Sequence, residues 1–313
     1  ISNYANLTNF GIVKTRNVPA GYTKDDALTT TLNGKLDERS KDKISVYKKS
    51  DTDLVLASDY KIVAPTDCTK MFNACASLVN LDLSNFDTSK VTIMHTMFQN
   101  CNKLVSLKGL ENWNTENVTS MLAMFNKCFA LTELDISNFN TSKVTTMKSA
   151  FSACSALNKL DVSHFDTSKV TDMQAMFHNC SALGELDVSN FDTSNVKTMD
   201  GIFYGCSALK NIDVSNFDTS NVTNMQLMFF NCSSLTSLNL SSFDTSKVIT
   251  WTSMLKGTFK TSESSTLTIS DKFVYGATNS SVGSAQFTKA ELVSKTGFNT
   301  SVKLMRGTTE VTA

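Results

Sequence analysis

Cysteine is the most reactive side chain that recurs regularly in this sequence. Seven of the eight cysteines repeat every 26 residues, with one step of 27 between Cys101 and Cys128. An even number of cysteines in a secreted protein favours disulfides. A single column at a repeat period, however, is typical of a packing ladder in which cysteine acts as a small buried apolar residue. Neighbouring repeats would hold the Cα atoms ~8–10 Å apart, beyond the ~7 Å that a disulfide spans, so we predict free, buried thiols. The column consists of Cys75, Cys101, Cys128, Cys154, Cys180, Cys206 and Cys232.

Aspartate forms a second column, which we expect to face outward. Lys108 and Asn239 interrupt it. Because neighbouring strands lie ~4.8 Å apart, stacked carboxylates repel one another unless lysine, backbone N–H groups or a cation relieve them. Three interpretations remain open: solvated acids with such relief, a row of Ca²⁺ ions, and a recognition surface for a basic or hydroxyl-rich partner. Carboxylate oxygens suit Ca²⁺, although the D-x-[DN]-x-[DN] loop is absent. The column consists of Asp82, Asp135, Asp161, Asp187 and Asp213.

The other reactive side chains give no catalytic arrangement. His95, His164 and His178 fall at different positions of the repeat, so their spacing predicts surface residues rather than a zinc or catalytic site. The recurring methionines are spaced as core residues of a helix. The sequence contains no G-x-S-x-G, P-loop or H-E-x-x-H motif. We therefore expect that the protein is not an enzyme and uses no cofactor, and we assign no metal ligands.

Two apolar patterns in each repeat must position these columns. Leu81 and Leu83 alternate with polar residues, which is strand periodicity. From Val91 to Leu104, apolar residues stand three and four apart, which favours one face of a helix, and Asp87-Thr88-Ser89 would cap its start. A fixed period of this length indicates a solenoid, in which each coil packs only against its neighbours. We predict an α/β solenoid: a right-handed coil with short parallel strands on one face and short helices on the other.

The repeat is similar to that of a known family. Residues 207–229 read SALKNIDVSNFDTSNVTNMQLMF, and the pattern covers about residues 66–256. It resembles the BspA-like leucine-rich repeat of bacterial surface proteins. The resemblance implies a leucine-rich-repeat-like fold, a place on the cell surface, a role in adhesion or interaction, and no catalytic residues. It covers neither end of the chain.

The extent of the repeat divides the chain into three parts. Residues 1–63 predict an N-terminal arm with a small β-rich module. Residues 64–256 predict the solenoid of about seven repeats, with a bulge at Gly109, where one residue is inserted. Residues 257–313 predict a C-terminal cap of the kind that a solenoid needs for solubility.

Short patterns predict elements in both flanking parts. Residues 1–15 predict a strand or an extended arm. Residues 44–46 and 54–56 flank a polar turn and predict a hairpin. Residues 267–269 predict one more strand on the open end of the solenoid. Thr288 predicts the N-cap of a short helix.

Charge and hydropathy narrow the function. Lysine plus arginine and aspartate plus glutamate number 29 each, which gives no electrostatic case for binding nucleic acid or an anionic membrane. No apolar run is long enough to span a bilayer. Because the resemblance implies a place on the cell surface, we expect an extracellular, surface-displayed protein that binds protein or glycan on a host or neighbouring cell through the strand face.

The alternative is a structural subunit of an extracellular appendage, such as a filament, a fibre or a virion decoration. It would be anchored, and would self-assemble, through the N-terminal arm. For the first interpretation, the strand-face residues expected to bind are Asn80, Asp82, Lys108, Glu133, Asp135, Lys159, Asp161, Glu185, Asp187, Asn211 and Asp213.

Overall fold

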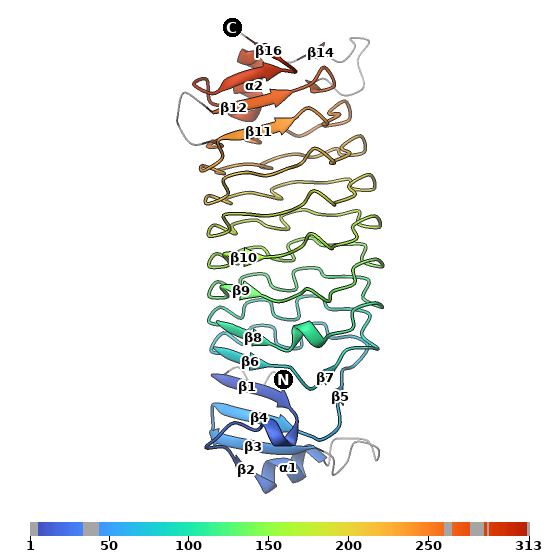
Figure 1. Cartoon of the computed structure of the whole chain (residues 1–313), viewed down its shortest axis with the longest axis vertical. Coiled ribbons are helices and arrows are strands. Elements are labelled where there is room, and N and C mark those ends of the chain that lie inside the picture. Colours follow the sequence, from blue (N-terminus) through green and yellow to red (C-terminus); the bar gives the residue numbers. More distant parts are fainter. Residues whose placement is uncertain (1–5, 34–43, 260–264, 276–284, 287, 312–313) are drawn as a thin grey trace.

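The computed structural model describes residues 6–33, 44–259, 265–275, 285–286 and 288–311. The chain winds as coils stacked along the long axis, with a small sheet at each end (Figure 1). It is mostly sheet with few helices, and the strands form several small parallel and mixed sheets. One apolar cluster runs through the coils and into both ends.

The N-terminal residues form part of a sheet rather than an arm. β1 (Asn9–Val13) lies between β4 (Asp53–Ala57) and β6 (Asn80–Asp82), parallel to both. The predicted hairpin is confirmed, because β3 (Ser45–Ser50) pairs antiparallel with β4. Of the two alternatives predicted for residues 1–15, the strand is confirmed: β1 joins the module to the first coil, and its Ile12 is buried. With β2 (Thr23–Lys24) and β8 (Ser106–Lys108), the strand order is β2-β3-β4-β1-β6-β8.

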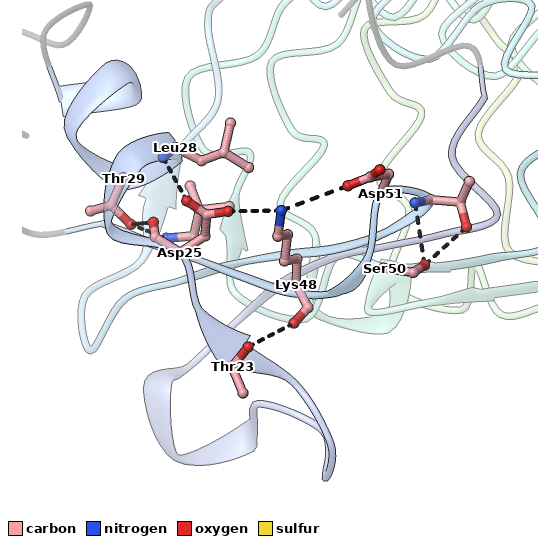
Figure 2. Close-up of polar contacts among 9 residues, drawn as sticks. Thr23, Asp25, Leu28, Thr29, Lys48, Ser50 and Asp51 are labelled. Carbon is pink, nitrogen blue, oxygen red and sulfur yellow. Dashed lines mark hydrogen bonds and ion pairs between the residues drawn. The ribbon is translucent and has the colours of Figure 1, made fainter.

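A polar cluster fixes α1 (Asp26–Asn33), which the sequence did not predict, against β3 (Figure 2). Asp25 accepts a hydrogen bond from the Leu28 N–H at 2.8 Å, and its carboxylate lies 3.1 Å from Lys48 Nζ. Lys48 also lies 3.6 Å from Asp51. The Leu28 N–H and then Lys48 lower the pKa of Asp25, while the bond to Asp25 raises the pKa of Lys48. The role of this cluster is therefore to hold α1 against β3.

The predicted helices of the repeat are wrong, since no α-helix lies within residues 44–259, all of which the structure describes. Each segment such as Met94–Cys101 is instead a run of turns, which we call a turn segment. Within a coil, the Met97 N–H donates to the Met94 carbonyl at 3.4 Å. Between coils, the Phe98 N–H donates to the Met124 carbonyl at 2.8 Å. The burial pattern is nevertheless as predicted: Val91, Met94, Met97, Phe98, Cys101 and Leu104 are all 0% exposed.

Left-handed residues explain why the backbone forms turns instead of a helix. Thr96 (φ 52°) and Asn100 (φ 62°) stand four apart, and the other turn segments carry such residues at the same positions. N–H groups then alternate between a carbonyl three residues back and a carbonyl of the next coil. A helix would use every N–H within its own segment. The left-handed conformation costs about 1–2 kcal/mol per residue, and the bonds between coils offset that cost.

Further parallel pairing joins the coils elsewhere. Parallel bridges link one residue of each coil to the next, in the column Asp67, Ile93, Ser120, Thr146, Asp172, Thr198, Asn224 and Thr250. Other parallel pairs are β5 (Ile62–Val63) with β7 (Phe86–Asp87) and β9 (Glu133–Leu134) with β10 (Lys159–Leu160). Short 3₁₀ turns are η2 (Thr15–Asn17) and η3 (Leu110–Asn112).

The inserted residue forms the turn η3 rather than the predicted β-bulge. Gly109 precedes η3 with φ 95°, as expected for a glycine in a conformation that other residues avoid. A Cβ atom at this position would lie 2.4 Å from Ser84 N in the preceding coil. The extra residue is therefore accommodated by a close backbone approach that requires glycine.

The C-terminal residues continue the stack and cover its end. The strand predicted at 267–269 is confirmed as β12 (Thr266–Ile269), which pairs parallel with β11 (Ser237–Leu240). The predicted helix is confirmed as α2 (Lys289–Thr296), and Thr288 and Glu291 form a capping box. The sheet ends with β15 (Lys303–Arg306) and β16 (Thr309–Glu310), and β13 (Val274–Tyr275) pairs with β14 (Ala285–Gln286).

Candidate binding surface

The residues expected to bind lie on one side of the stack. We call this side the strand side and define it as the outward positions of segments 80–82, 106–108, 133–135, 159–161, 185–187 and 211–213. Figure 1 shows β6, β8, β9 and β10 on this side. Asp82 is half-buried, and the other predicted residues are exposed. Pairing places Asp82 beside Lys108 and Glu133 beside Lys159. Segments 185–187 and 211–213 are not strands, so the predicted strand face is regular only in part.

The aspartate column is relieved by backbone and hydroxyl donors from its own turns. The Ser163 N–H donates to Asp161 Oδ1 at 3.0 Å, and the Ser163 hydroxyl donates to the same atom at 2.7 Å. Hydroxyl and then N–H groups of the following serines lower the pKa of Asp135, Asp161, Asp187 and Asp213. Asp161 and Asp213 act in the opposite direction on Asp187, but more weakly. These contacts favour the interpretation of solvated acids. In the described ranges no group of three or more His, Cys, Asp or Glu residues could hold a metal ion.

Several strand-side charges take no part in holding the fold together. Within the part of the chain that the structure describes, the side chains of Lys108, Glu133, Lys159 and Glu185 make no hydrogen bond or ion pair. Elsewhere on the coils, outward polar side chains join one coil to the next. Thr171 Oγ1, for example, donates to the Thr145 carbonyl at 3.3 Å. These four strand-side charges are thus available to a partner.

Hollows lie along the strand side, and three of them are lined wholly by described residues. The smallest, about 240 Å³, lies where the N-terminal module meets β6 and β8 and is lined in part by Pro19 and Tyr22. The largest, about 730 Å³, lies over β8, β9 and β10 and contains Lys108 and Glu133. The third, about 370 Å³, lies further along and contains Glu185. The sequence did not predict these hollows. The insertion at Gly109, next to Lys108 in the lining of the largest hollow, was the available signal for that hollow.

The cysteine column is a packing ladder with an additional hydrogen bond. All eight cysteines are free and buried, as predicted for the thiols. The Cys154 thiol donates to the Phe125 carbonyl of the preceding coil at 3.1 Å, and the same bond recurs along the column. Thr258 takes the same place one coil after Cys232 and donates to the Phe229 carbonyl at 2.7 Å. Burial raises the pKa of Cys101 to about 12. The thiols are therefore structural groups and not nucleophiles.

The histidines occupy different environments, and only part of their prediction holds. His164 is exposed, with its ring against Phe165, whereas His95 and His178 are half-buried. His178 stacks on Tyr204 with ring centroids 4.2 Å apart, and Tyr204 stacks on Phe230 at 4.8 Å. Burial lowers the pKa of His178. This half-exposed stack was missed, although its members stand 26 residues apart in the sequence.

Comparison with known proteins identifies the repeat region. A model of the family described as "Mycoplasma protein of unknown function, DUF285" matches residues 66–183 and 145–267. Together these overlapping matches cover more than half of the chain. The chain belongs to the DUF285 family. No curated protein and no solved structure matches it. The DUF285 matches span the coils, the cysteine column and the whole strand side.

Among the helices of the described residues, none combines the length and the apolar character that crossing a bilayer requires.

Proposed function

We propose that this DUF285 protein is an extracellular, surface-displayed binding protein whose strand side contacts a protein or glycan on a host or neighbouring cell. The observation that carries the proposal is the set of unengaged charges on the strand side. Glu133, Lys159 and Glu185 are exposed and make no hydrogen bond or ion pair among the described residues. Hollows under these charges add shape to a surface suited to many modest contacts.

The finer architecture belongs to the same proposal. We propose that the stack is a solenoid of the BspA-like leucine-rich-repeat type in its sequence, with turn segments in place of helices. The resemblance of the repeat supports a role in adhesion or interaction, because members of that family are mostly such proteins. The role is binding without catalysis.

The alternative role, as a subunit of an extracellular appendage, loses one of the two observations that motivated it. An anchoring arm was expected in the first residues, but β1 is an internal strand of a sheet and α1 is fixed by Asp25 and Lys48. Described residues therefore offer no free N-terminal segment for donation to a neighbouring subunit.

The test compares two variants that each remove five negative charges. The strand-side variant carries Glu133→Gln, Asp135→Asn, Asp161→Asn, Glu185→Gln and Asp187→Asn. Asparagine preserves the serine turn, since Asn239 already accepts the Ser241 N–H at 3.0 Å. The control variant carries Asp87→Asn, Asp166→Asn, Asp192→Asn, Asp218→Asn and Asp244→Asn, in turns of the same kind at another corner of the coil.

Both variants and the unmodified chain are applied to an array of glycans and extracellular-matrix proteins. We expect the unmodified chain to bind a subset of the array, the strand-side variant to lose that binding, and the control variant to keep it. Absence of binding by the unmodified chain, or equal loss in both variants, contradicts the proposal.

A further inference from the structure

Two of the strand-side hollows adjoin and form one groove. The smaller hollow and the largest hollow share Ser106 and Lys108 of β8. The shared lining makes a continuous depression from the N-terminal module, across β8, to β10. We call this depression the β8 groove.

The groove lies over a break in the sheet. The sheet that contains β1 and β6 ends at β8, and β9 pairs with β10. No backbone hydrogen bond joins β8 to β9, both of which the structure describes in full. The turn segments of the same coils remain joined, as by the Phe98 N–H and the Met124 carbonyl. The coils therefore separate on the strand side here, next to the insertion taken up by Gly109 and η3, and strand pairing is also absent beyond β10, at 185–187 and 211–213.

The break leaves polar backbone groups and apolar side chains at the base of the groove. Ser106 and Lys108 use their backbone groups toward β6, so alternation along β8 leaves the N–H and carbonyl of Leu107 on the opposite edge. The Leu107 side chain is half-buried, unlike its buried counterparts Leu81 and Leu134. Val105 beside it is 46% exposed.

The two ends of the groove differ in chemistry. Val13, Pro19, Tyr22 and Val55 make the smaller hollow largely apolar. The largest hollow has four carboxylates and two lysines in its lining, so its net charge is negative. Its acids are Glu111, Glu133, Asp135 and Asp161. Glu111 is occupied by the Gly109 N–H and by Asn112, whereas Glu133 has no partner among the described residues.

We propose that the β8 groove binds an extended peptide segment that carries an apolar side chain at one end and basic side chains at the other. This inference rests on the proposed function, because it names the class of partner for one part of the strand side. The apolar side chain fills the hollow beside Tyr22, and the basic side chains lie over Glu133, Asp135 and Asp161. Where the segment crosses β8, one of its peptide groups reaches the free N–H or carbonyl of Leu107.

The dimensions fit a short segment. From β1 to β10 the groove crosses three paired strand intervals of ~4.8 Å each and the wider gap between β8 and β9, so it is at least about 19 Å long. An extended chain covers ~3.3 Å per residue, so about six residues span the groove. A glycan fits less well, because its hydroxyl groups do not match the apolar lining of the smaller hollow.

The experiment applies the full chain to an array of hexapeptides. One set carries leucine or phenylalanine at either end, followed by two or three lysines or arginines. Matched sets carry glutamate or serine in place of the basic residues. We expect the apolar–basic set to bind at least about tenfold better than either matched set, with affinity falling as salt rises.

Variants then locate the binding. Glu133→Gln with Asp135→Asn should weaken binding of the apolar–basic set about tenfold. Glu185→Gln with Asp187→Asn, the same charge change in the 370 Å³ hollow, should leave it unchanged. Gly11→Ala should reduce the preference for the large apolar residue. Its methyl group would project among Val13 and Val55, at 3.5 Å from each and without a clash.

Three outcomes overturn the proposal: no preference for the apolar–basic set, equal weakening by both charge variants, or binding to glycans only. Failure of the peptide proposal can be distinguished from failure of the proposed function. If the strand-side variant loses binding to the glycan and matrix array while no peptide set binds, the strand side remains the binding surface and only the peptide assignment is wrong.

Discussion

The hydrogen bond from each cysteine to the preceding coil can be tested at Cys154. Its side chain is 0% exposed, and its thiol lies 3.1 Å from the Phe125 carbonyl, which also accepts the Cys128 N–H at 3.1 Å. Cys154→Ala removes one buried heavy atom, at a cost of about 1 kcal/mol, and a weak hydrogen bond, at a cost of about 0.5–1 kcal/mol. We expect the free energy of unfolding to fall by about 2 kcal/mol.

Two further substitutions separate packing from hydrogen bonding. Cys154→Thr and Cys154→Val share a branched shape and differ only in a hydroxyl against a methyl group. Thr258 already makes the equivalent bond at 2.7 Å, so the threonine variant should be more stable than the valine variant by about 1–2 kcal/mol. If the thiol served only as a small apolar residue, the order would reverse, because an unpaired buried hydroxyl costs about 1–3 kcal/mol.

The assay is urea unfolding followed by circular dichroism. The slope of the free energy against urea concentration shows whether the transition keeps its character in each variant. A valine variant as stable as the threonine variant, or more stable, refutes the hydrogen-bonded ladder.

Other predictions test the remaining parts of the account. Burial raises the thiol pKa values, so the folded chain keeps these protons to higher pH than the unfolded chain does. This difference stabilises the fold fully below about pH 8.5. The stabilisation should be lost as the pH rises toward about 12, where Cys101 and Cys206 titrate. Melting temperatures above pH 9 that match those at pH 7 would contradict this. The lowered pKa values of Asp135, Asp161, Asp187 and Asp213 act at the other extreme, so stability should also fall as the pH drops below about 4, and an acid-stable melt would show that the serine turns contribute nothing. Gly109→Ala should lower the free energy of unfolding by about 3 kcal/mol or more, because its Cβ would lie 2.4 Å from Ser84 N. The control Gly11→Ala has no contact under 3.5 Å and should lower it by less than about 0.5 kcal/mol, as measured by thermal melting. Phe165→Ala, at a residue 2% exposed, should cost about 3–5 kcal/mol and split the calorimetric transition, because coils couple only to their neighbours; a single uniformly shifted transition would argue against that coupling.

The sequence predicted which residues are buried but not the backbone that buries them. An apolar spacing of three and four residues fits one face of a helix, and it fits a run of three-residue turns equally well. What decides between them is the pairing of groups such as the Phe98 N–H and the Met124 carbonyl, which lie in different coils. Local spacing carries no information about such long-range bonds. A polar or small residue recurring at the left-handed positions, such as Asn100, was the available signal.

The candidate surface was likewise predicted in part. The period placed Glu133, Asp135 and Lys159 on one side, because outward positions follow from which residues pack inward. The hollows could not be foreseen, since they depend on the separation of β8 from β9 and on how β1 joins the first coil. The domain boundaries at 63 and 256 remain predictions.

Carboxyl footprinting tests the central claim most directly. The full chain is labelled with a carbodiimide and a small amine, with and without the ligand that the arrays identify, and the labelled sites are read by mass spectrometry. We predict that ligand protects Glu133, Asp135 and Asp161 on the strand side and leaves Asp166 and Asp192 at the other corner labelled as before. Protection of Asp166 and Asp192 instead, or unchanged labelling of every strand-side carboxylate under saturating ligand, would contradict the assignment of binding to the strand side.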